Sequence, residues 1–320
     1  MNKLSFSKDI KNEILSNQII SDEYGLAFLS GLFSSSAQIE INNEISFMLA
    51  TDLQILPDFI NSITKKLYGD LFEVEICKGY QIKKQNYYKL IFNQNSYNLL
   101  LDTGCLKLEN GTMTRNMAID EYMIKEQESL KYFVQGVFVG CGTSSIKINQ
   151  QDRLSTGYHL EFASHNYEFL SGLSHILAQF DISAKLVKRK NLYILYVKDA
   201  NEVSNVLALM GAYNAVLSLQ NEMALREVRN KVNRQTNCMN ANINKMVEAS
   251  IKQNDAISII IKEIGLEELP QDLQNVALLR MANPEESLEE LVKLASFPIT
   301  KSGLNYRLNK LVKLADKFKE

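Results

Sequence analysis

The chain has 320 residues, of which 46% are hydrophobic and 22% are charged, and its formal net charge is −2. This composition is typical of a globular protein long enough for two domains, and it excludes a disordered or membrane-embedded chain. The first nine residues lack the apolar core of a signal peptide and no apolar run is long enough to span a bilayer, so we expect a cytoplasmic protein with no membrane partner.

A short amphipathic helix is expected over residues 3–17, and it precedes the first of two related stretches. Residues 29–39 and residues 133–146 both space small residues three or four apart in an apolar run and then change into a strand-like tail. In an alignment of the two stretches, Gly31 falls on Gly136. Small residues at this spacing let two helices touch backbone to backbone. We therefore expect a pair of packed helices at the seam of a duplicated domain.

The same order of elements is predicted after each stretch, and the alignment also places Phe33 on Phe138. After the first stretch we expect a strand, a helix, two strands and a final helix near residues 45–50, 52–68, 71–77, 87–92 and 97–101. After the second we expect the same five elements near residues 158–163, 166–180, 183–188, 192–197 and 202–210. This repetition predicts an internal duplication, with a turn at residues 109–112 between the halves.

Residues 222–253 contain neither glycine nor proline, and their pattern predicts a long helix. One stripe of this helix is apolar and contains Val228, Val232, Met239, Ile243 and Met246. A second stripe combines Arg226 with Asn230, Asn233, Asn237, Asn240 and Asn244. Because asparagine is a poor helix former, a stripe of five asparagines needs a reason, and contact with DNA phosphates or with the first domain is one such reason. The alternative is compositional, since Asn, Lys and Ile are frequent throughout the chain, and the sequence does not say whether the surface contacts DNA or protein.

Basic residues are concentrated in residues 226–252 and 298–320, each with six basic and two acidic residues and therefore a local charge of +4. This distribution is expected of a chain in which only certain faces meet DNA phosphates, although a solvated helix face looks the same. The candidates for a secondary contact with DNA or with the first domain are Arg226, Arg229, Asn233, Arg234 and Asn237.

Residues 265–320 predict a compact helical domain. Pro270 stands where the first turn of a helix tolerates proline, Ser287 opens a capping box, and Thr300 caps the last helix. Three helices with a tight turn before the last form a helix-turn-helix, with the motif over about residues 286–318. Its DNA-binding candidates are Thr300, Lys301, Ser302, Asn305, Tyr306, Arg307, Asn309, Lys310 and Lys313. Asparagine and serine read base edges and cations hold phosphates, while packing of this hairpin on the first domain is the alternative.

The paired stretches resemble the twin motifs of LAGLIDADG homing endonucleases, and further motifs resemble the WhiA family of bacterial DNA-binding regulators in order and spacing. These motifs are Gly157-Tyr158-His159-Leu160-Glu161, Gly211-Ala212-Tyr213-Asn214-Ala215, Val232-Asn233-Arg234-Gln235-Thr236-Asn237-Cys238, Ala241-Asn242 and Ser302-Gly303-Leu304-Asn305-Tyr306-Arg307-Leu308. The resemblance covers nearly the whole chain. It implies an α+β fold in which a duplicated LAGLIDADG-like saddle, with two pseudo-symmetric αββαββα-type halves, is followed by an all-α helix-turn-helix domain. The expected limits are 1–220 for the saddle, with halves of about 1–125 and 126–220, then 221–264 for a helical connector and 265–320 for the DNA-binding domain.

A LAGLIDADG nuclease holds its metal ions through an acid at the end of each motif helix. The alignment places Ser36 and Cys141 at these two positions, and neither offers the anionic oxygen that Mg²⁺ prefers. The nearest acids, Glu40 and Asp152, lie outside the motifs. The four cysteines show no CxxC spacing, and no glycine-rich loop with a following lysine is present. We therefore expect no catalytic site, no metal and no cofactor.

By resemblance, we expect a non-catalytic, sequence-specific DNA-binding regulator of transcription, linked to cell division and chromosome segregation and associated with the nucleoid. Its expected partner is double-stranded DNA, with another transcription factor or RNA polymerase as a further partner, and its oligomeric state stays open. The alternatives are a residual metal-dependent endonuclease and a protein-interaction scaffold that does not bind DNA.

Overall fold

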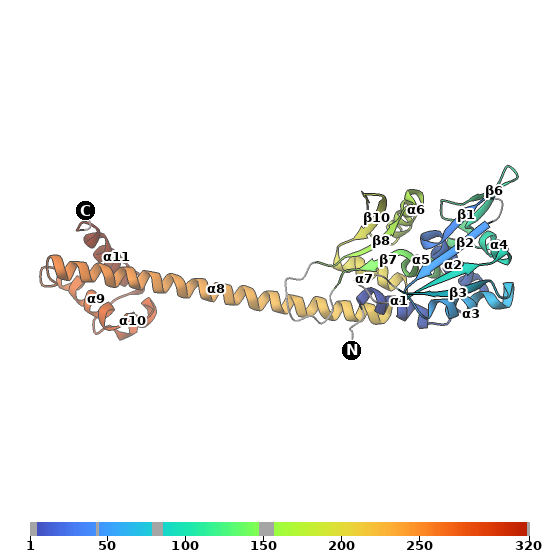
Figure 1. The fold of residues 1–320 in the computed structure, drawn as a ribbon. Helices are drawn as coiled ribbons and strands as arrows, with labels where there is room; N and C mark the ends of the chain where they lie inside the picture. The colour runs from blue at the N-terminus through green and yellow to red at the C-terminus, as the bar shows by residue number, and fades with distance from the viewer. Residues whose placement is uncertain (1–4, 43–44, 79–85, 147–156, 319–320) are drawn as a thin grey trace. The chain divides into compact units, whose positions relative to one another are not determined.

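Figure 1 shows the computed structural model of the chain, which describes residues 5–42, 45–78, 86–146 and 157–318. The chain divides into two compact units, Met1–Leu225 and Arg226–Glu320, which we call unit 1 and unit 2. Each unit has its own hydrophobic core. Within the described ranges, no helix is both long and apolar enough to cross a lipid bilayer.

The first half of unit 1 places helices on a four-stranded antiparallel sheet. Its elements are α1 (Phe6–Ser16), α2 (Asp22–Ser36), β1 (Gln38–Ile41), β2 (Ile45–Thr51), α3 (Leu56–Tyr68), β3 (Phe72–Cys77), β4 (Tyr87–Phe92), the 3₁₀ turn η1 (Gln94–Ser96) and α4 (Tyr97–Asp102). The strands are hydrogen-bonded in the order β1-β2-β4-β3. In β2 the buried residues alternate with more exposed ones, which is the pattern of a sheet with one face in the core.

The second half of unit 1 repeats this arrangement. Its elements are α5 (Gln127–Cys141), β7 (Gly142–Ser144), β8 (Leu160–Ser164), α6 (Tyr167–Ala178), β9 (Lys185–Arg189), β10 (Leu192–Val197) and α7 (Ala200–Leu209). Its strands pair in the order β7-β8-β10-β9, which matches the order in the first half position by position. The predicted duplication and the α+β fold class are therefore confirmed, although β8 and β9 each begin two residues later than expected.

The two halves meet where α2 and α5 pack backbone to backbone, near the middle of unit 1 (Figure 1). A Cβ atom on Gly31 would overlap the carbonyl oxygen of Phe133, and a Cβ atom on Gly136 would overlap the carbonyl oxygen of Phe28. Both glycines therefore allow a helix contact that no other residue type permits without a shift of backbone. This close contact is the one that the spacing of small residues predicts.

Equivalent aromatic pairs connect each motif helix to its own sheet. The ring of Phe33 on α2 packs edge-on against Phe47 on β2, with centroids 4.9 Å apart. The ring of Phe138 on α5 packs edge-on against Phe162 on β8, with centroids 6.0 Å apart. All four side chains are fully buried. The alignment of Phe33 with Phe138 is thus reproduced by the packing of the two halves.

A hairpin and a 3₁₀ turn connect the halves. The hairpin consists of β5 (Leu106–Glu109) and β6 (Thr112–Arg115), and the turn is η2 (Glu121–Ile124). At its tip, Asn110 and Gly111 have φ values of 51° and 76°. Two successive positive φ values belong to the type I′ turn, which favours Asn-Gly, so the predicted turn at residues 109–112 is confirmed.

Helix α1 and the long helix α8 (Tyr213–Glu263) are both fixed to the core of unit 1. The Ser7 hydroxyl donates to the Ser144 carbonyl at 2.8 Å and accepts from the Ser144 amide at 2.6 Å, which fastens α1 to β7. The carboxylate of Glu13 accepts from the amides of Asn214 and Ala215, the first turn of α8. An acid at a helix N-terminus satisfies free N–H groups and complements the helix dipole.

The helix α8 is longer than the predicted helix over residues 222–253. Residues with positive φ lie beyond both of its ends, at Gly211 (φ 68°) and Gly265 (φ 84°), and no glycine or proline lies between them. Its last turns contribute Ile257 and Ile260 to the core of unit 2. The remaining elements of unit 2 are α9 (Gln271–Ala282), α10 (Leu288–Leu294) and α11 (Lys301–Asp316), which lie against that end of α8 (Figure 1).

We predict that Gly136→Ala destabilises unit 1 by about 2 kcal/mol or more, because overpacking at a backbone contact forces the helices apart. Urea unfolding followed by circular dichroism measures the change. The matched control is Gly157→Ala, since no atom of the described residues lies within 4 Å of a Cβ built on Gly157. Equal unfolding midpoints for the two variants would show that α2 and α5 separate at little cost.

Candidate nucleic-acid interface

The last helix of unit 2 presents a polar and basic face to solvent. Eight of the predicted DNA-binding residues are exposed on α11 or immediately before it, namely Thr300, Lys301, Ser302, Asn305, Tyr306, Asn309, Lys310 and Lys313, and Arg307 is half-buried. The Tyr306 side chain is 71% exposed, although tyrosine is a large and partly apolar residue. The amide of Asn309 lies 3.4 Å from the Oδ1 atom of Asn305, so the two asparagines are neighbours on one face. This face therefore presents amide, hydroxyl and ammonium donors side by side.

The opposite face of α11 fixes the helix in its unit. Leu304, Leu308 and Leu311 are buried, and they pack with Leu291 of α10 and Val276 of α9. The Ser287 hydroxyl accepts from the amide of Glu290 at 3.2 Å, so Ser287 is the N-cap of α10 and forms one half of the predicted capping box.

Thr300 stands immediately before α11. The amide of Gly303 donates to the Thr300 hydroxyl at 3.1 Å, so this predicted site residue serves as the N-cap of α11. The packed leucines and the cap together hold the exposed face in a fixed orientation within unit 2.

A buried arginine fixes the connection between α9 and α10. The Arg280 side chain is only 2% exposed, and its Nη1 atom donates to the carbonyls of Glu286 at 2.8 Å and Asn283 at 3.3 Å. Burial lowers the pKa of this guanidinium. The hydroxyl of Ser250 on α8 donates to the carbonyl of Pro284 in the same connection. The sequence pattern gives no sign of this role, because the carbonyls that Arg280 contacts belong to the connection between the helices and not to a motif.

Two of the predicted site cations are paired with acids inside unit 2. The Nε atom of Arg307 lies 3.0 Å from the Oδ2 atom of Asp272 on α9. The Nζ atom of Lys301 lies 2.5 Å from the Oε1 atom of Glu289 on α10. Sequence reasoning missed both pairings, because 35 residues separate Asp272 from Arg307 and 12 separate Glu289 from Lys301, so no helical spacing connects either pair.

The predicted secondary surface lies on α8. Arg229, Asn233, Arg234 and Asn237 are exposed, and Arg226 is half-buried. The apolar stripe is also exposed at most of its positions, namely Val228, Val232, Met239 and Ile243. Both stripes of α8 therefore face solvent in this part of the chain, which is unusual for so many apolar side chains on one helix.

The ends of the motif helices carry neutral side chains. The Ser36 hydroxyl donates to the Leu32 carbonyl at 2.8 Å, and the Ser35 hydroxyl donates to the same carbonyl at 3.0 Å. A Cβ atom on Gly140 would overlap both hydroxyl oxygens, so the end of α5 lies directly against these serines. Cys141 follows Gly140 and ends α5. The structure thus brings Ser36 and Cys141 to the same end of the helix pair, as the alignment requires.

Cys141 is held as a neutral thiol. Burial raises its pKa to about 12, and the opposing influence of the Lys11 ammonium on α1 is smaller. Burial also lowers the pKa of Lys11. Glu40 lies exposed on β1, and Asp152 lies outside the described residues. Among the residues that the structure does describe, no three His, Cys, Asp or Glu side chains come together in a group that could hold a metal ion.

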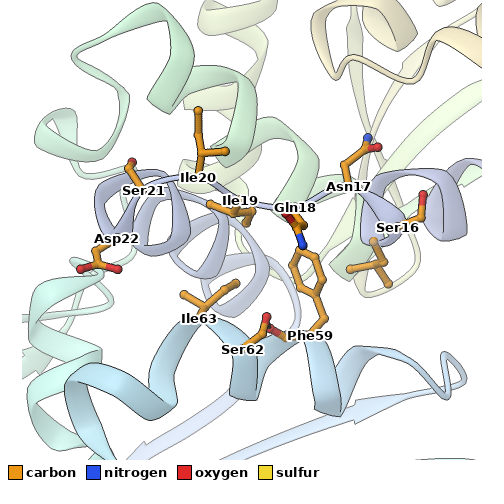
Figure 2. Close-up of a pocket in the computed structure, with 11 residues that line it drawn as sticks. Ser16, Asn17, Gln18, Ile19, Ile20, Ser21, Asp22, Phe59, Ser62 and Ile63 are labelled. Atoms are coloured by element: carbon orange, nitrogen blue, oxygen red, sulfur yellow. Dashed lines mark hydrogen bonds between the residues drawn. The ribbon is translucent and has the colours of Figure 1, made fainter.

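A hollow of about 330 Å³ lies between α3 and the linker that joins α1 to α2. Figure 2 shows Phe59 and Ile63 pointing from α3 toward this linker. The residues that line it include a single charged side chain, Asp22, which pairs with Lys66 at 3.7 Å. These groups offer no acid–base pair and no cluster of cations, so the hollow does not define a catalytic or phosphate site.

Taken with the fold, this geometry defines a class of protein in which a LAGLIDADG-like α+β unit is joined to a helix-turn-helix unit. Family profiles match both parts, the "WhiA LAGLIDADG-like domain" over residues 130–229 and the "WhiA C-terminal HTH domain" over residues 232–315. A "Probable cell division protein WhiA" from Clostridium acetobutylicum is 34% identical, with 99% of each chain covered. The chain belongs to the WhiA family.

Further relatives agree with this assignment. A "Probable cell division protein WhiA" from Clostridium beijerinckii is 32% identical, again with 99% of both chains covered. The crystal structure of full-length DUF199/WhiA from Thermatoga maritima matches with a TM-score of 0.56 and 22% identity, covering 98% of this chain and 99% of that chain. At this identity the structural match supports the fold, including the order of the two units along the chain.

We predict that the free energy of unfolding falls as the pH rises above about 9. The Cys141 thiol has a pKa of about 12 in the folded chain and an ordinary value of 9.0 when exposed. Between these values the unfolded state loses a proton that the folded state keeps, so alkaline pH favours unfolding.

Urea unfolding at pH 8, 9.5 and 10.5 measures the slope of the free energy of unfolding against pH. We expect this slope to be shallower for Cys141→Ala than for the unaltered chain. For Cys238→Ala we expect the same slope as for the unaltered chain. Cys238 is exposed and is therefore the matched control. Identical slopes for the two variants would contradict the assignment, as would rapid alkylation of Cys141 in the folded chain at pH 8.

Proposed function

We propose that this protein is a non-catalytic, sequence-specific DNA-binding protein that regulates transcription and acts in cell division and chromosome segregation. The observation that carries the proposal is the exposed face of α11, where Asn305, Tyr306 and Asn309 stand beside Lys310 and Lys313 on a helix held by its buried leucines. Asparagine side chains read adenine edges, and lysines hold phosphates without regard to sequence. Membership in a family with a helix-turn-helix domain supports the same conclusion.

The proposed absence of catalysis rests on the ends of the motif helices. Hydrolysis of a phosphodiester with metal ions needs anionic oxygens that hold those ions beside the scissile bond. Ser36 uses its hydroxyl within α2, and Cys141 keeps its proton at neutral pH. In this proposal unit 1 adds DNA contacts or binds a protein partner, such as another transcription factor or RNA polymerase, and cuts nothing.

The link to cell division comes from the names of the Clostridium relatives and is proposed here for this chain. A DNA-binding protein with this role is expected on the nucleoid. Depletion of the protein in its own cells, followed by measurement of cell length and DNA content, tests the link. Normal division and normal DNA content after depletion would oppose it.

We predict that Asn305→Ala mainly reduces sequence preference, whereas Lys310→Ala weakens binding to all duplexes alike. Losing one phosphate contact should lower the slope of log affinity against log salt by about one, and losing a base contact should leave that slope unchanged. Fluorescence anisotropy with a duplex selected from a random pool and with a scrambled duplex measures both effects. The control is Lys262→Ala, which removes one charge from α8 rather than α11. Equal losses on both duplexes for Asn305→Ala would contradict its role in base readout.

We also predict that the intact chain does not nick supercoiled plasmid during prolonged incubation with Mg²⁺ or Mn²⁺. The reason is the lack of an acid at residues 36 and 141. Gel electrophoresis separates nicked from supercoiled plasmid. Nicking that Glu40→Gln or Asp152→Asn abolishes would establish the endonuclease alternative.

A protein-interaction role without DNA is a second candidate, and the exposed apolar stripe of α8 favours it. Salt distinguishes this candidate from the first. Affinity for DNA that depends on several phosphate contacts should fall by about tenfold or more over a fourfold rise in salt concentration. A chain that shows no salt-dependent affinity for any duplex would leave the protein-interaction role as the better account.

A further inference from the structure

Arg307 lies in the second turn of α11, and its guanidinium has defined neighbours. Its Nε atom lies 3.0 Å from the Oδ2 atom of Asp272 in the first turn of α9. Its Nη1 atom lies 3.9 Å from the place that a Cβ atom on Gly303 would take, so the side chain runs back along α11 toward its first turn. Among the described residues, only the Nε atom of Arg307 has a hydrogen-bond acceptor, and both Nη groups are left to bind another partner.

Stability alone gives a weak reason for this pair. The side chains of Arg307 and Asp272 are 32% and 52% exposed, and ion pairs with such exposure contribute little to folding. A carboxylate beside a DNA-binding helix also repels phosphate. Asp272 therefore weakens DNA binding unless it also improves the contact between the Arg307 guanidinium and DNA.

We infer that Asp272 is a positioning residue for the DNA interface, which holds the Arg307 guanidinium so that its Nη groups meet a backbone phosphate at the first turn of α11. A guanidinium is planar and its donors have a fixed geometry, so an acceptor on Nε orients the remaining donors. The ligand is the phosphodiester of duplex DNA, and the inference rests on the proposed function.

The neighbouring pair of Lys301 and Glu289 provides a contrast within the same unit. An ammonium group is a compact charge that presents donors in rotatable directions, so Glu289 cannot orient Lys301 as Asp272 orients Arg307. Removing Glu289 only removes a negative charge near the DNA face. Removal of Asp272 should therefore lower the affinity for DNA, whereas removal of Glu289 should leave that affinity unchanged or raise it.

The test is fluorescence anisotropy with the full chain, using the selected and the scrambled duplex. We expect Asp272→Ala to weaken binding to both duplexes by about fivefold, because one oriented phosphate contact is lost. Asp272→Asn should stay within about twofold of the unaltered chain, since its amide oxygen still accepts from Nε. Glu289→Ala should bind equally or more tightly, and Glu268→Ala, an exposed acid elsewhere in unit 2, is the control for charge alone.

An Arg307→Ala background shows whether Asp272 acts through Arg307. In that background Asp272→Ala should cause no further loss, because removal of the carboxylate then only reduces repulsion. The same fivefold loss in both backgrounds, or tighter binding by Asp272→Ala alone, would overturn the inference while DNA binding itself stands. If the unaltered chain binds no duplex, the proposed function fails and the inference fails with it. Thermal unfolding by circular dichroism checks that each variant is folded.

Discussion

The contact between α2 and α5 is the constraint on which unit 1 depends. Gly31 and Gly136 lie against backbone carbonyls of the opposite helix, so the two helices approach more closely than any side chain allows. This approach brings the two sheets into equivalent positions around the helix pair, with Phe33 and Phe138 packed on their respective sheets. It also brings the ends of α2 and α5 together. Whether this site can hold a metal ion then depends on the side chains at the two helix ends, which are Ser36 and Cys141.

Unit 2 depends on a different constraint, which is the orientation of α11. Buried leucines fix one face of the helix, and the Thr300 cap fixes its start. Arg280 fixes the connection between α9 and α10 through two backbone carbonyls. A surface that reads base edges must be held rigidly, because base recognition depends on hydrogen bonds with narrow geometry. The same packing that stabilises the unit therefore presents Asn305 and Tyr306 together.

Much of the fold could be predicted from the sequence, because it depends on local patterns that repeat. The glycine spacing, the Asn110-Gly111 turn and the caps at Ser287 and Thr300 are all short-range signals, and the structure confirms each of them. The start of α8 was missed, since Glu13 caps it from about two hundred residues away. The pairing of Arg307 with Asp272 was missed for the same reason. Contacts between distant residues leave no periodic signal, and the environment of Cys141 also appears only once the chain is folded.

We propose that the exposed face of α11 reads DNA. The most direct test of this proposal is photocrosslinking of the intact chain to a selected duplex that carries 5-iodouracil, followed by mass spectrometry of the crosslinked peptides. We expect crosslinks at Tyr306 and at neighbouring residues of α11, and their loss when a scrambled duplex replaces the selected one. Crosslinks confined to residues 5–212, with α11 unmodified, would contradict it.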